Sequence, residues 1–80
     1  MDGYVLLSLK PGMKKKFMNK VQDVKEVKEA WLTIGIYDAI VKIQSTSIDE
    51  LERIYFNKID KIEGIAHSRL HFVACPRTRK

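Results

Sequence analysis

The sequence predicts an α+β fold in which four antiparallel strands form one sheet and two helices cover one of its faces. Apolar or alternating segments, typical of strands, occupy residues 4–9, 27–34, 39–44 and 65–75. Segments with apolar residues every third or fourth position, typical of helices, occupy residues 13–25 and 47–62. Their order along the chain is therefore strand, helix, strand, strand, helix, strand, and the 80 residues make one domain, residues 1–80.

The first strand and the first helix are separated by a strong breaker. The apolar run YVLLSL at residues 4–9 ends at Lys10, which Pro11 and Gly12 follow. The next segment carries lysines between its apolar positions, which indicates an amphipathic helix. Those apolar positions are Met13, Phe17, Val21 and Val24.

The second and third strands are predicted to form a hairpin. Residues 27–34 and 39–44 are rich in β-branched and apolar residues, and Gly35 supplies a residue that tolerates positive φ in the turn between them. A turn does not require the Tyr37 and Asp38 that stand beside this glycine. These two residues therefore suggest that the turn also holds something.

The second helix has the clearest start signal in the chain. Ser47 and Glu50 form a capping box, in which each end residue satisfies a backbone N–H of the other. The residues expected on one buried helical face are Ile48, Leu51, Tyr55, Ile59 and Ile62. In the last strand, Ser68, Leu70 and Phe72 alternate with Arg69 and His71.

This order of elements is the ferredoxin-like βαββαβ arrangement, because right-handed crossovers place both helices on one side of the sheet. The uncovered face should then be polar at every second residue, yet the strands are apolar on both sides. We expect that face to be a dimer interface that contains Trp31, Val27 and Val41. The alternative is a monomer with an exposed apolar face or one covered by its own tail.

Composition bounds the function classes. A net charge of +5 keeps nucleic acid among the possible partners without demanding it. Residues 76–80 are expected to be a basic tail, and the lone Cys75 to be a small apolar residue near a strand end. The absence of a long apolar run and of a signal-peptide pattern predicts no membrane association and a cytoplasmic location.

Side chains that could support catalysis or hold a metal are few. His67 and His71 share a strand face but stand roughly 13 Å apart at about 3.3 Å per residue, too far to bind one metal ion. We expect no enzyme activity, no metal and no cofactor. The lysines at residues 14–16 favour a solvated helix face, with contact to nucleic acid as the alternative.

Three segments together resemble the regulatory (RAM) domain of the Lrp/AsnC family of transcription regulators. They are VKEAWLTIGIYDAIVKI with its Gly-x-x-Asp turn, STSIDELERI at the start of the second helix, and IEGIAHS before the last strand. The resemblance covers residues 4–75. It implies dimers that assemble into an octamer or a similar ring and bind amino acids between subunits.

The resemblance also implies a ligand site. Gly35, Ile36, Tyr37 and Asp38 would line the pocket, with Asp38 accepting hydrogen bonds from an α-ammonium group while backbone N–H groups of the turn meet the carboxylate. The last strand of a neighbouring subunit would contribute a pair of residues, Ser68 and Leu70. Because family members often carry a hydroxyl at both of these positions, Leu70 indicates an apolar contact instead.

Family regulators begin with a helix-turn-helix domain, whereas this chain begins at its first strand. It therefore resembles a stand-alone form that does not read DNA directly. The function expected is an amino-acid-binding regulatory module. Two alternatives are an interaction protein that co-assembles with full-length Lrp/AsnC regulators without a metabolite and, from a different class, a small ferredoxin-like enzyme.

Overall fold

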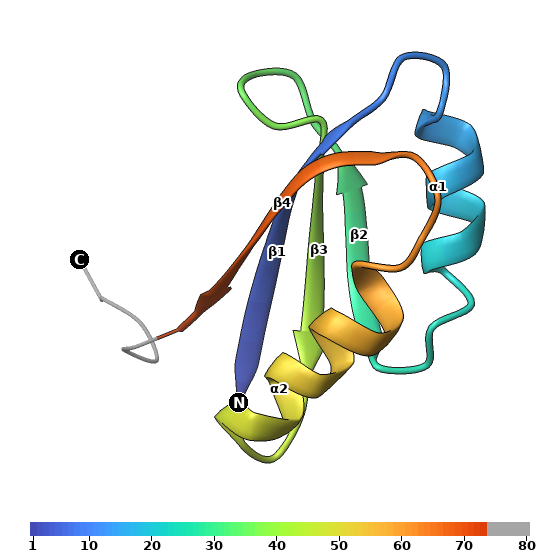
Figure 1. Ribbon diagram of the computed structural model, residues 1–80. Helices are drawn as coiled ribbons and strands as arrows, with labels where there is room; N and C mark the ends of the chain where they lie inside the picture. The colour runs from blue at the N-terminus through green and yellow to red at the C-terminus, as the bar shows by residue number, and fades with distance from the viewer. Residues whose placement is uncertain (74–80) are drawn as a thin grey trace.

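The computed structural model describes residues 1–73, and they form four strands and two helical segments in the predicted order (Figure 1). Cys75 and the basic tail at residues 76–80 lie outside the described residues. The elements are the strands β1 (Asp2–Leu9), β2 (Val27–Leu32), β3 (Ala39–Gln44) and β4 (Ile65–Phe72), and the helices α1 (Lys14–Val21) and α2 (Ile48–Ile54), the latter continued by the π-helical turn η1 (Tyr55–Ile59).

The sheet has the strand order β2-β3-β1-β4, and every neighbouring pair is antiparallel. The helices lie on one side of this sheet, as Figure 1 shows, and the other side carries no element of the described chain. The prediction of a ferredoxin-like α+β fold is confirmed.

The core lies between the sheet and the two helices. Every second residue of β1 and β3 is buried there, and Phe17 and Val21 of α1 pack against them from the helix layer. Leu51 and Ile59 close the core from the second helix. Because one residue in two of each central strand, β1 and β3, packs against the helices, the other residues of these strands face away from the core.

Both helices differ in detail from the prediction. Helix α1 ends at Val21 instead of continuing to residue 25, because the next residues form tight turns in which Val24 N–H bonds to the Val21 carbonyl. The second helix starts as predicted, with Ser47 Oγ accepting from Glu50 N–H at 3.2 Å. Its first expected core residue, Ile48, is instead 44% exposed.

The predicted composition of the open face is wrong for two residues. Val41 is completely buried in the core, and Val27 packs against that core, so neither lies beside Trp31. The cause for Val27 is a shift of register between Val27 and Glu29, where an irregularity in β2 breaks the strict alternation of faces. Trp31 itself does lie on the open side, 42% exposed.

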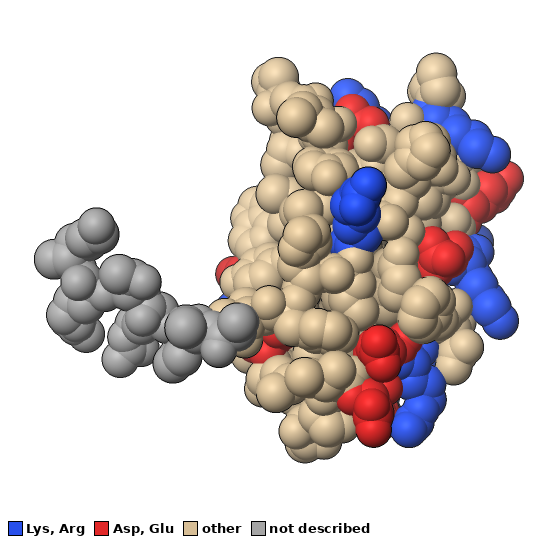
Figure 2. All heavy atoms as spheres, turned by 60° about the vertical axis from the view of Figure 1, so that its left-hand side comes forward, with Lys and Arg blue, Asp and Glu red and all other residues tan. Residues whose placement is uncertain are grey.

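One row of neighbouring side chains crosses the open face from edge to edge. Trp31 lies opposite Ile40, Ile40 opposite Leu6, and Leu6 opposite Arg69. The row is thus apolar over three strands and ends on a cation at the β4 edge. Figure 2 shows the side of the molecule that is on the left in Figure 1, where uncharged residues cover most of the surface, one Lys or Arg side chain lies near the middle, and most other charged side chains lie toward the right of the view.

Candidate functional site

The β2–β3 loop is fixed to the sheet at its base. Thr33 N–H bonds to the Asp38 carbonyl at 2.8 Å, and the Thr33 hydroxyl donates to the Tyr37 carbonyl at 2.7 Å. Asp38 also reaches β1, where its N–H bonds to the Leu7 carbonyl and its Oδ2 accepts from Leu9 N–H at 2.8 Å. The Asp38 carboxylate therefore has a structural role, and it retains further acceptor sites because an ionised carboxylate offers about four lone pairs.

The tip of the same loop is apolar and faces solvent. Gly35 adopts φ +151°, a conformation that L side chains rarely take, which confirms that this position needs glycine. Ile34 and Ile36 on either side of it are 106% and 88% exposed. A loop with a rigid base and two exposed isoleucines is a surface suited to contact with another molecule.

Ser68 on β4 is the centre of a hydrogen-bond chain that sequence reasoning did not foresee. Its hydroxyl donates to Asp60 Oδ1 at 2.8 Å and lies 2.5 Å from the Tyr55 hydroxyl. Because the single hydroxyl hydrogen of Ser68 goes to Asp60, the Tyr55 hydroxyl must donate to Ser68. The chain Tyr55, Ser68, Asp60 leaves Ser68 with one free lone pair and no free donor.

The π-helical turn η1 places both partners of Ser68. Asp60 N–H bonds to the Tyr55 carbonyl at 2.8 Å, five residues back, and this wider turn carries Tyr55 at its start and Asp60 at its end. Such single turns occur frequently at functional sites. Here the turn connects the second helix to the edge strand.

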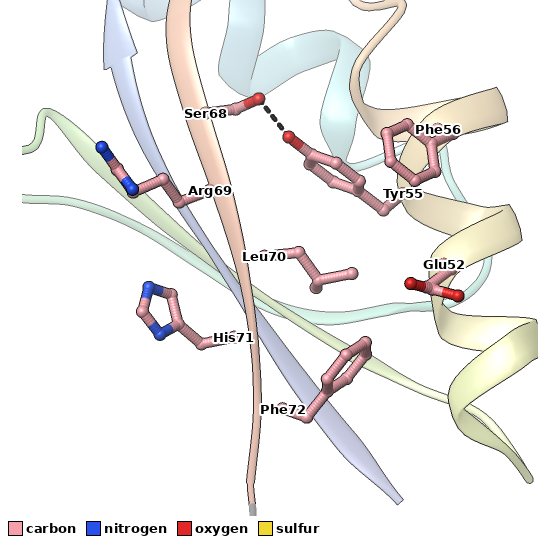
Figure 3. A pocket seen from close by; sticks show the side chains of 8 residues that line it. All are labelled: Glu52, Tyr55, Phe56, Ser68, Arg69, Leu70, His71 and Phe72. Atoms are coloured by element: carbon pink, nitrogen blue, oxygen red, sulfur yellow. Dashed lines mark hydrogen bonds between the residues drawn. The ribbon is translucent and has the colours of Figure 1, made fainter.

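A hollow of about 410 Å³ lies between the second helix and β4 (Figure 3). Figure 3 shows Leu70, Phe72 and the rings of Tyr55 and Phe56 on the helix side of β4, with Glu52 at one margin. Leu70 thus lies on the helix side of β4 among aromatic side chains of its own chain.

A second hollow, of about 420 Å³, lies near the start of β4, and we call it the polar hollow because polar side chains line it. Its lining includes Ser8 of β1, Tyr37 of the loop, and His67 and Arg69 of β4. Figure 3 shows Arg69 pointing to the side of β4 away from the helices. Ser68 borders both hollows, because β4 separates them.

Within one chain, the predicted ligand residues fall into four places. Tyr37 and Ser68 border the polar hollow, Leu70 lies in the first hollow, Asp38 is at the loop base, and Gly35 and Ile36 are at the loop tip. Sequence reasoning did not select the other residues that line the polar hollow, Ser8, His67 and Arg69. The β4 alternation signalled that His67 and Arg69 share a face, but pairing Ser8 with His67 needed the register of β1 against β4.

The ion pairs among residues 1–73 lie away from the residues that line the polar hollow. The Lys58 ammonium donates to Glu26 Oε2 at 2.7 Å, and this hydrogen bond holds the pKa of Glu26 below its usual range despite the opposing effect of burial. Residues 1–73 contain no group of three or more His, Cys, Asp or Glu side chains that could hold a metal ion. None of the helices in this part of the chain has the length and apolar character to cross a membrane.

The strand order β2-β3-β1-β4 and the two helices on one face define a ferredoxin-like α+β domain. The model of the Lrp/AsnC ligand binding domain family matches residues 2–76, and the chain therefore belongs to this family. The regulatory protein AsnC of Escherichia coli K12 is 39% identical over 46 residues, which cover 58% of this chain and 30% of that protein. The family is thus one of regulatory proteins, and this chain matches less than a third of that relative.

Solved structures show the same likeness. The structure of E. coli AsnC has a TM-score of 0.86 at 28% identity, over 99% of this chain and 54% of that chain. The crystal structure of FFRP-DM1 has a TM-score of 0.81 at 28% identity, over 88% and 93% of the two chains. A transcriptional regulator of Neisseria meningitidis, solved as a complex with L-Met, has a TM-score of 0.85 at 14% identity, over 98% and 52%, and so shares the fold.

Proposed function

We propose that this domain is an amino-acid-binding regulatory module that acts in the cytoplasm as a dimer or a larger ring. Its site combines Gly35, Ile36, Tyr37 and Asp38 of one subunit with Ser68 and Leu70 of a neighbour. Two findings support an amino acid as effector: the matched family is described as a ligand binding domain, and a structural neighbour was solved with L-Met.

The observation that carries this proposal is the construction of the β2–β3 loop. Bonds from Asp38 and Thr33 hold its base, while Ile34 and Ile36 at its tip meet solvent in the single chain. Exposing two large aliphatic side chains forgoes roughly 2 kcal/mol or more of burial energy per side chain. A neighbouring subunit that covers the tip would recover that energy and complete a pocket beside Tyr37.

The open sheet face provides the dimer contact. The row of Trp31, Ile40 and Leu6 is apolar over three strands, and an aromatic side chain of this size dominates the energetics of an interface. Trp31→Glu is expected to shift the protein toward monomers in analytical ultracentrifugation. Ile48→Glu is the matched control, because Ile48 is exposed to a similar degree on α2, and it should leave the oligomer intact.

A thermal-shift panel with the twenty L-amino acids tests the ligand. A compound that binds only the folded state raises stability by RT ln(1 + [L]/Kd), about 2.7 kcal/mol at a hundred times Kd. We expect one or a few amino acids to raise the melting temperature in a saturable manner. If all twenty leave it unchanged, the domain does not bind an amino acid.

The second candidate is an interaction protein that co-assembles with full-length Lrp/AsnC regulators and binds no metabolite. The exposed Trp31 row favours it, because a relative with the same open face could replace the second copy of this chain. Co-purification with a tagged helix-turn-helix relative, lost in Trp31→Glu and kept in Ile48→Glu, is the expected result. Recovery of homo-oligomers alone would exclude this candidate.

A further inference from the structure

We propose that Arg69, His67, Ser8 and Tyr37 form a carboxylate-binding site at the β4 edge of the open face. The proposal of an anion site rests on the hydrogen-bond donors of these four side chains, which line one hollow. Its assignment to the carboxylate of an amino acid rests on the proposed function. The two statements can therefore fail separately.

The register of the sheet gathers the four groups. Ser8 lies opposite His67, and Leu6 lies opposite Arg69, so the side chains of His67 and Arg69 share the face of Ser8. Residues two apart on a strand stand roughly 7 Å from each other, close enough for both side chains to reach one small ligand. Tyr37 approaches from the loop and lines the same hollow of about 420 Å³.

The lining is rich in hydrogen-bond donors and contains no acidic residue. It offers the five N–H donors of Arg69, the hydroxyls of Ser8 and Tyr37, and the imidazole of His67. Among residues 1–73 the acidic partners in ion pairs belong to other cations: Glu63 to Lys16, Asp2 to Lys42, Glu50 to Arg53 and Glu26 to Lys58. Arg69 has no such partner in this part of the chain, so its charge is available to a ligand.

The geometry of the cation favours a carboxylate. A guanidinium is planar, stays charged, and presents paired N–H groups that match the two oxygens of a carboxylate. The neighbouring hydroxyls can satisfy the remaining lone pairs of the anion. A small planar anion therefore fits the donors that surround Arg69.

An acceptor for the opposite end of a zwitterion lies on residues that adjoin these donors in the chain, although Asp38 is not itself among the residues that line the hollow. Asp38 follows Tyr37 in the chain, and its Oδ2 is bonded to Leu9 N–H, one residue beyond Ser8. An amino acid could thus place its ammonium group at Asp38 and its carboxylate at Arg69. This assigns the carboxylate to Arg69 in place of the loop N–H groups expected from the family resemblance.

The site lies at the margin of the proposed dimer contact. The apolar row is centred on Ile40 and Leu6, and Arg69 ends it on the edge strand. A dimer that buries the centre of the sheet leaves a ligand room at this edge, between subunits.

The anion site is tested with acetate as the probe and acetamide as its neutral analogue of the same shape. In ¹H–¹⁵N spectra at constant ionic strength, acetate should shift Ser8, Tyr37, His67 and Arg69 in a saturable manner, and acetamide should not. Arg69→Gln should abolish these shifts. Arg53→Gln, which removes an exposed arginine on α2, should retain them. Shifts that persist in Arg69→Gln, or that centre on residues 14–16, would overturn the proposal.

The source of the carboxylate is tested with each amino acid that stabilises the wild type, against its carboxamide. If Arg69 holds the α-carboxylate, the carboxamide loses binding, acetate competes, and Arg69→Gln raises Kd at least tenfold while Arg53→Gln does not change it. An unchanged Kd in Arg69→Gln would refute this assignment and leave amino-acid binding intact. Acetate binding without any amino-acid binding would support the anion site and refute the proposed function.

Discussion

Asp38→Ala is expected to lower stability before any ligand is considered. The substitution removes the charged acceptor of Leu9 N–H, and Leu9 is 8% exposed, so that backbone group loses a partner in a place that water reaches poorly. Hydrogen bonds to charged groups contribute about 1.5–3 kcal/mol. Because Asp38 is only partly buried, we take about 2 kcal/mol, which lowers the melting temperature of a domain of this size by roughly 8–16 °C.

Asp38→Asn separates the structural role of Asp38 from a ligand role. The asparagine oxygen can still accept from Leu9 N–H, so the loss of stability should fall to about 1 kcal/mol. The charge that would meet an ammonium group is nevertheless gone, and effector binding should weaken strongly. Comparing the effector-dependent shift in Asp38→Asn with that in the wild type therefore measures the ligand contact alone.

Thermal denaturation of the free proteins provides the assay. Asp23→Ala is the control, because Asp23 is an exposed residue in the turn after α1, and its loss should change stability by at most about 0.5 kcal/mol. If Asp38→Ala melts with the wild type, or if Asp23→Ala loses as much stability, the bond to β1 does not hold the loop as described.

Three further predictions concern single contacts. The pKa of Glu26 is lowered in the folded state, so its bond to Lys58 stabilises the fold above pH about 4.5, and this stabilisation is lost as the pH falls through the folded-state pKa. Melting curves across pH should therefore show Glu26→Gln less stable than the wild type at neutral pH and equally stable in acid. Ser47→Ala removes the acceptor of Glu50 N–H and should cost about 1 kcal/mol in chemical denaturation, and an unchanged midpoint would contradict the cap. Gly35→Ala should cost about 1–3 kcal/mol through backbone strain alone, since open space surrounds the position; a melting temperature equal to that of the wild type would show that the loop relaxes freely.

The sequence was sufficient for the order of elements because each carries its own local signal. The Pro11–Gly12 breaker, the Ser47 cap and the β4 alternation all predict structure within a few residues of themselves, and all are confirmed. Gly35 was likewise predictable, because a positive φ is a local requirement. The fold class follows from these signals together with the handedness of the crossovers.

Errors arose where a long-range contact decides the outcome. Strict alternation placed Val27 on the open face, but the irregularity in β2 turns it toward the core. No local pattern distinguishes a π-helical turn from α-helix, so the link from Tyr55 through Ser68 to Asp60 was not predictable. The polar hollow depends on the β1–β4 register for the same reason.

The proposal that this domain binds an amino acid beside its fixed β2–β3 loop is tested by titration calorimetry of the wild-type protein with each of the twenty L-amino acids. We expect saturable binding of one or a few of them at no more than one site per chain. Twenty titrations that show only heats of dilution would contradict it.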